Sequence, residues 1–111
     1  MKEEEYSHMF LSLVYSLQMQ TMIHLGKLPN PATGKTEVEL DAAQATIDMI
    51  DMLKAKTVNN LNENESRFID QILADLKLNY VDEKNKPQLQ EEQKTDEVAE
   101  KESADEPSPE N

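Results

Sequence analysis

The sequence predicts an all-α protein, a small three-helix bundle followed by a disordered acidic C-terminal tail. Three stretches carry apolar residues at helical spacing, and segments rich in proline, glycine and asparagine separate them. The 111 residues include no tryptophan and only two glycines, which argues against a sheet built on aromatic pairs and glycine turns. We expect one domain over residues 1–81 and the tail over residues 82–111.

The first helix is predicted over about residues 4–25. The glutamates at 3–5 complement the positive end of its dipole, and Gly26 supplies the stop. One broad face is apolar and contains Phe10, Leu11, Leu13, Val14, Leu17, Met22 and Leu25. The opposite side is uncharged, because Lys, Arg, Asp and Glu are absent from residues 6–26. A helix of a small monomer normally turns charged residues toward water, so we expect this helix to be buried on two sides.

A connector at residues 27–35, interrupted by two prolines and a glycine, leads to a second helix over about residues 40–56. Its apolar stripe contains Leu40, Ala43, Ile47, Ile50 and Leu53, widened by Met49 and Met52.

The third helix is predicted over about residues 63–79. Asn62 followed by Glu65 forms a capping-box pattern, and Leu61 can pack back onto the first turn. The apolar face of this helix contains Phe68, Ile69, Ile72, Leu73, Leu76 and Tyr80.

Charge excludes several partners. The net charge is −12, and residues 82–111 hold 11 acidic side chains against four lysines. Such a surface repels nucleic acid and anionic lipid. The tail is either a solubilising appendage or an acidic arm for a basic partner. Residues 9–25 are too polar for membrane insertion, and the acidic amino terminus is unlike a signal peptide, so we expect a cytoplasmic protein.

No catalytic, cofactor-binding or metal-binding residue is predicted, and no cofactor. The absence of cysteine excludes disulfides and thiolate chemistry. Gly34-Lys35-Thr36 lacks the earlier glycine of a phosphate loop. His8 and His24 are about 24 Å apart along one helix, too far to share a metal.

Asp48 and Asp51 lie one helical turn apart. They could bind a hard cation or share a proton, although solvated aspartates on an outer stripe are the simpler interpretation. The methionines either fill the core or form an adaptable contact surface.

Self-association is expected because the first helix offers more apolar side chains than two neighbours of moderate length can cover. A second copy paired across a two-fold axis would cover the remainder, and the alternative is a monomer with a neutral surface patch. The candidate interaction surface consists of Ser12, Ser16, Met19 and Ile23 on the first helix and Pro29, Asn30 and Pro31 in the connector. The proline-flanked asparagine is predicted to be exposed on a stiff, extended segment, and stiffness lowers the entropy cost of docking that segment onto a partner. The alternative is that the segment only spaces two helices.

The region from Phe10 to Val81 resembles a small bacterial family known as domain of unknown function 1844. The resemblance is carried by Phe10, Leu13-Val14, Ser16-Leu17, Leu25-Gly26, Pro29-Asn30-Pro31, Thr33-Gly34, Leu40, Ile47-Asp48-Met49, Met52-Leu53, Lys56-Thr57, Asn60-Leu61 and Leu76 to Val81. Asn59 stands where the family usually has glycine, and asparagine tolerates a left-handed backbone. The resemblance implies a cytoplasmic helical protein and supplies no activity.

The sequence therefore favours a non-enzymatic helical interaction module that forms a homodimer and binds another protein through apolar, methionine-bearing helix surface. Two alternatives remain open. One is a small apolar ligand bound between helices, and the other is a metal-dependent or carboxylate-based enzyme that uses Asp48 and Asp51.

Overall fold

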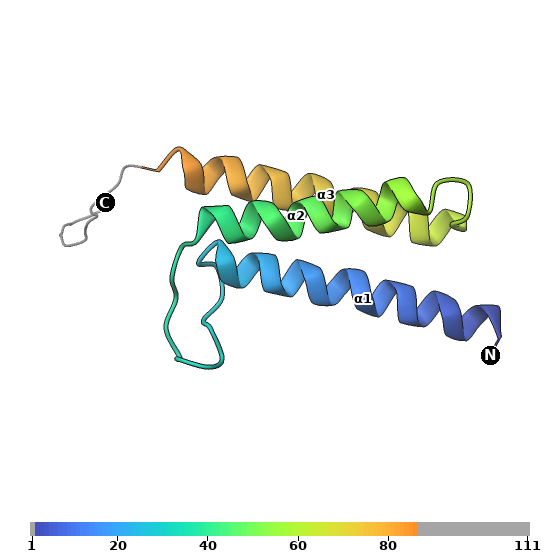
Figure 1. The fold of residues 1–111 in the computed structure, drawn as a ribbon, viewed down its shortest axis with the longest axis horizontal. Helices are drawn as coiled ribbons and strands as arrows, with labels where there is room; N and C mark the ends of the chain where they lie inside the picture. The colour runs from blue at the N-terminus through green and yellow to red at the C-terminus, as the bar shows by residue number, and fades with distance from the viewer. Residues whose placement is uncertain (1, 87–111) are drawn as a thin grey trace.

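The computed structural model describes residues 2–86, which form three helices packed side by side (Figure 1). The helices are α1 (Glu3–His24), α2 (Leu40–Lys56) and α3 (Glu63–Lys84). Each runs antiparallel to the next, so the start of α1 and the α2–α3 turn share one end of the bundle. The all-α three-helix prediction is confirmed for these residues. The predicted disordered tail lies outside the described residues from position 87 onward.

The predicted bounds of α2 agree with the structure, whereas α3 continues past Asn79 to Lys84. The third helix is therefore longer than predicted. The cause lies in Glu83, which is buried and whose carboxylate pairs with the Lys27 ammonium at 2.7 Å and with the Lys86 ammonium at 2.6 Å. Because Lys27 belongs to the α1–α2 connector, this cluster fastens the last turn of α3 to the bundle.

The helix ends follow the predicted signals. Gly26 adopts φ +75°, and the Lys27 N–H donates to the Met22 carbonyl at 2.9 Å, which closes α1. At the start of α3, the Glu65 N–H donates to the Asn62 side chain, and the Asn62 N–H donates to the Glu65 carboxylate, both at 2.8 Å. Asn59 adopts φ +65°, the left-handed conformation expected of it.

The core confirms the predicted faces of α2 and α3. Its buried apolar residues are Val14, Leu25, Ala43, Ile47, Ile50, Ile69, Ile72, Leu73 and Leu76. On α1 the prediction is partly wrong, because Leu13 is 48% exposed while Thr21 is fully buried. The buried side of α1 is therefore turned toward Thr21 and away from Leu13.

A pair of threonines explains this rotation of α1. The Thr21 and Thr46 hydroxyls lie 2.6 Å apart across the α1–α2 seam, and both residues are buried. The Thr21 hydroxyl also lies 2.7 Å from the Leu17 carbonyl, and that of Thr46 lies 3.0 Å from the Ala43 carbonyl. Because each hydroxyl finds a hydrogen-bond partner, burying the two polar groups costs little.

Within residues 2–86, none of the helices combines the length and apolarity needed to cross a membrane.

Candidate interaction surface

One stripe of exposed, uncharged side chains runs along α1. It contains Tyr6, Met9, Leu13, Ser16 and Gln20, which follow one another at alternating steps of three and four residues. We call it the α1 stripe. Its three large apolar members, Tyr6, Met9 and Leu13, are each about half exposed. Steps of three and four keep side chains on one side of a helix, and they are the spacing by which packed helices interlock.

A second stripe with the same alternating spacing runs along α2. It contains Ala42, Ala45, Met49, Met52 and Lys56, and we call it the α2 stripe. Met49 and Met52 are each about half exposed, so in the single chain they do not fill the core. The interpretation of these two methionines as core residues is therefore wrong.

Contacts within the bundle fix the direction of the α1 stripe. Thr21 points to α2, while Gln18 and Met22 line a groove together with residues of α3. At about 100° per residue, the stripe lies on the side of Thr21 that is turned away from α3. The α1 stripe therefore borders α2 and points out of the bundle.

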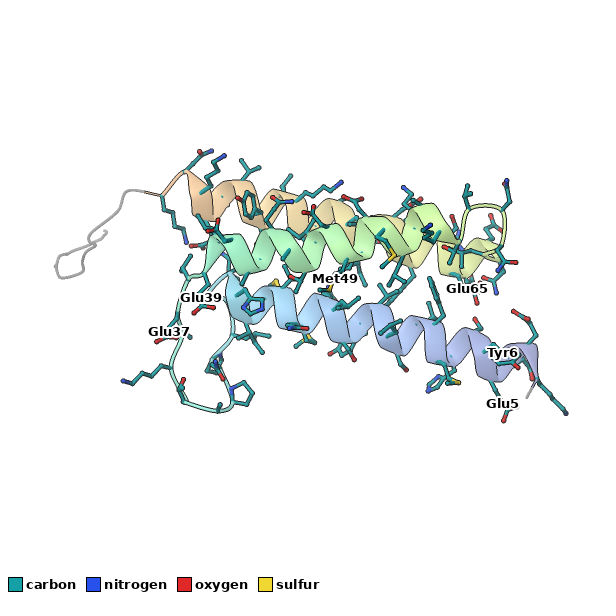
Figure 2. All side chains as sticks on the ribbon, in the orientation of Figure 1. Glu5, Tyr6, Glu37, Glu39, Met49 and Glu65 are labelled. Carbon is teal, nitrogen blue, oxygen red and sulfur yellow. The ribbon has the colours of Figure 1, made fainter. Side chains whose placement is uncertain are left out.

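The α2 stripe points the same way. Thr46 faces α1, whereas Lys54 and Asp51 reach across to α3, with the Lys54 ammonium 2.7 Å from the Asp70 carboxylate. The α2 stripe lies on the side of Thr46 away from these charged groups. Figure 2 shows Met49 beside the seam between α2 and α1. We call the two stripes together the α1–α2 face.

Charge separates this face from the opposite side of α2. On the α3 side, Asp51 and Asp70 pair with lysines of the neighbouring helix, at 3.2 Å for Lys77 and 2.7 Å for Lys54. On the α1–α2 face, α1 contributes no charged residue between positions 6 and 26, and Lys56 stands at one end. The centre of the face is therefore apolar or neutral.

The residues predicted as a surface on α1 are only partly accessible. Ser12 and Ser16 are exposed, whereas Met19 and Ile23 are half buried. Ile23 lines a small cavity together with Asn30 of the connector, which folds back over the end of α1. The single chain leaves the Ser12–Ser16 side open to solvent, so burial of α1 on two sides is not achieved within one chain.

Sequence reasoning missed Tyr6 and Leu13 as surface residues. A helical wheel based on residue types places every leucine on the buried face, and it therefore places Leu13 in the core. The signal that could have found the stripe is its alternating spacing from Tyr6 to Gln20, which is offset from the buried positions Val14 and Thr21.

The connector differs from the predicted extended segment. Pro29 and Pro31 are exposed, but Asn30 is half buried and its side chain accepts a hydrogen bond from the Ala32 N–H at 2.8 Å. The Gly34 N–H donates to the Asn30 carbonyl at 2.7 Å, which closes a turn. The side chain of Asn30 is thus engaged within the turn, and the expectation of an exposed asparagine on an extended segment is wrong.

The candidate carboxylates on α2 have protein partners. The Asp48 carboxylate accepts from the Gln44 side chain at 2.9 Å, and Asp51 pairs with Lys77. His24 lies 3.7 Å from the Glu39 carboxylate. In the described part of the chain, no group of three His, Asp or Glu side chains comes together to hold a metal ion.

Two titratable groups are perturbed at opposite ends of the bundle. The pKa of Glu65 is held below its ordinary value, chiefly by hydrogen bonding from the Ser7 hydroxyl and next by the Asn62 backbone N–H. Burial of the carboxylate acts in the opposite direction. The hydrogen bond to Glu83 raises the pKa of Lys27, again against burial. Figure 2 shows Glu65 at the end of the bundle where α1 begins.

An open groove of about 600 Å³ lies between α1 and the second half of α3. Met22 and Leu76 are among its apolar lining residues, Asp75 and Asp82 are among its polar ones, and Leu78 at its edge is 75% exposed. This volume lies within the range of small-molecule sites, although the groove shares its apolar walls with carboxylates.

Comparison with known proteins identifies the family. No curated protein and no solved structure shows significant similarity to the chain. Residues 7–83, which include nearly all of α1, the connector, α2 and most of α3, match the family described as Domain of unknown function (DUF1844). Because the match covers well over half of the 111 residues, this chain belongs to the DUF1844 family.

Proposed function

We propose that this protein is a non-enzymatic helical interaction module that binds protein, a second copy of itself included, through the α1–α2 face. The observation that carries the proposal is the face itself. Five large apolar side chains stand about half exposed on two adjacent helices, and they are Tyr6, Met9, Leu13, Met49 and Met52. Contiguous apolar patches of this kind on a small protein mark surfaces that another macromolecule covers.

The chemistry of the face favours protein over other macromolecules. A net charge of −12 opposes binding to phosphate backbones and to anionic lipid. Exposed methionines suit contact with a protein, because a flexible thioether adapts to irregular apolar surfaces. The uncharged length of α1 lowers the desolvation cost of covering it.

Site-specific photo-cross-linking tests this function in cells. A benzophenone amino acid replaces Leu13 in the full chain, and the matched control carries it at Leu78, an exposed leucine on α3. We expect protein adducts from position 13 that are absent from position 78. Equal adducts from both positions, or none from position 13, would overturn the proposal.

The groove between α1 and α3 favours a second candidate function, the binding of a small, partly apolar molecule. Its volume of about 600 Å³ is sufficient for such a ligand, and Met22 and Leu76 offer apolar contact. Native mass spectrometry of the purified full chain tests it. A small molecule that remains bound to the full chain and is lost in Met22→Asn supports this function. A ligand-free spectrum of the chain purified directly from freshly lysed cells argues against it.

A further inference from the structure

Resting on the proposed function, we infer that the occupant of the α1–α2 face is a second copy of this chain, packed through the same face about a two-fold axis. Two copies of α1 and two of α2 then form a four-helix bundle, and the two α3 helices lie outside it. Two-fold pairing is the commonest form of self-association, and it requires a face complementary to itself. Spacing, register and area give the α1–α2 face that property.

The spacing of both stripes is the first support. The α1 stripe and the α2 stripe each repeat at steps of three and four residues, as the interlocking positions of antiparallel bundles do. Each stripe is separate from the buried positions of its own helix, such as Val14 on α1 and Ile47 on α2. Each helix therefore carries one seam for its own bundle and a second seam that faces outward.

The register within the chain places one small side chain opposite two large ones. Thr21 lies opposite Thr46, and because α1 and α2 are antiparallel, Ser16 lies at the height of residue 51. A two-fold axis along the helices keeps these heights and lays α1 of one copy on α2 of the other. The small side chain of Ser16 then enters the space between Met49 and Met52 of the second copy.

The size of the face approaches what a stable pair needs. Helices of 22 and 17 residues, each about 10 Å wide and rising about 1.5 Å per residue, present a footprint of about 600 Å² before side-chain relief is counted. A standard interface buries about 800 Å² of accessible surface on each partner. The footprint is about three quarters of this figure, and side-chain relief adds to it.

Charged residues border one end of the face. The first turn of α1 carries Glu3, Glu4 and Glu5, and α2 ends at the same end of the bundle with Lys56. Among residues 2–86, Lys56 forms no ion pair within its own chain. In this register Lys56 lies at the height of Leu11, about 9 Å along the helix from Glu5, so an axis along the helices leaves both charged groups at one end of the pair without joining them.

Disulfide trapping tests the inference, and the sequence contains no cysteine that could compete with the introduced ones. Full-length Ser16→Cys and Met52→Cys chains are mixed and oxidised, and the products are weighed by mass spectrometry. We expect a disulfide between the two different chains, since bridged residues need Cα atoms within about 7 Å. Leu78→Cys on α3 is the matched control and should form no adduct above the collisional level.

The outcomes separate this inference from the proposed function. A disulfide joining two Ser16→Cys chains supports the same face with its two-fold axis across the helices. A Leu78→Cys adduct stronger than both would show that two copies pack through α3 and would overturn the inferred face. A monomer at every concentration in sedimentation equilibrium of the unmodified chain would overturn the second copy. If the chain is monomeric while the photo-probe at Leu13 captures a different protein, the proposed function stands and this inference fails.

Discussion

Replacing Leu13 by glutamine should weaken self-association without unfolding the chain. Leu13 is 48% exposed in the single chain, and glutamine supports helix nearly as well as leucine. Fully burying a leucine contributes roughly 1.5–3 kcal/mol, so covering its exposed half contributes about 0.7–1.5 kcal/mol. A two-fold interface covers it twice, which gives about 1.5–3 kcal/mol, or about a 10- to 150-fold increase in Kd.

Sedimentation velocity over a concentration series measures this Kd for the full chain and the variant. Leu78→Gln is the matched control, because it makes the same chemical change at a more exposed leucine outside the face. Thermal melts at concentrations well below Kd check that both variants keep the fold. An equal change in Kd for the two variants, or no change for Leu13→Gln, would refute the reasoning.

Three further predictions concern stability. Thr46→Val should cost about 1 kcal/mol by removing one of the two hydrogen-bond partners of Thr21, whereas Thr21→Val/Thr46→Val should recover most of that loss, and a double-mutant cycle by chemical denaturation measures the coupling. Since the folded-state pKa of Glu65 is lowered, its carboxylate stabilises the fold above its ordinary pKa and ceases to do so as pH falls through the folded value. The Tm advantage of wild type over Glu65→Gln should therefore shrink on acidification, and a constant difference would contradict this cause. At Asn59, with φ +65°, substitution by Ala should cost about 1 kcal/mol while substitution by Gly should not, and equal melting temperatures would contradict it.

Local signals were enough to predict most of the fold. The bounds of α2, the Gly26 stop and the Asn62–Glu65 capping box depend on residues within a few positions of each other, and the structure confirms them. The end of α3 was missed because Glu83 is stabilised by Lys27, a residue far away in sequence. A sequence pattern predicts that a charged residue is exposed unless its ion-pair partner is known.

The candidate surface was harder to predict for a related reason. Burial of Thr21 depends on a hydroxyl supplied by Thr46 on another helix, and a pattern of residue types counts both as polar. A helical wheel that does not take this pair into account assigns Leu13 to the core and does not reveal the α1 stripe. The predicted exposure of Asn30 failed similarly, because its side chain closes a turn with Ala32.

Hydroxyl-radical footprinting of the unmodified chain, at matched radical dose above and below Kd, tests most directly whether a second copy covers the α1–α2 face. Met9, Met49 and Met52 are about half exposed in the single chain, as is Tyr15 on another side of α1. The three methionines should lose reactivity as the protein concentration rises, while Tyr15 should keep its rate. Methionines that react equally fast at both concentrations would contradict the covered face.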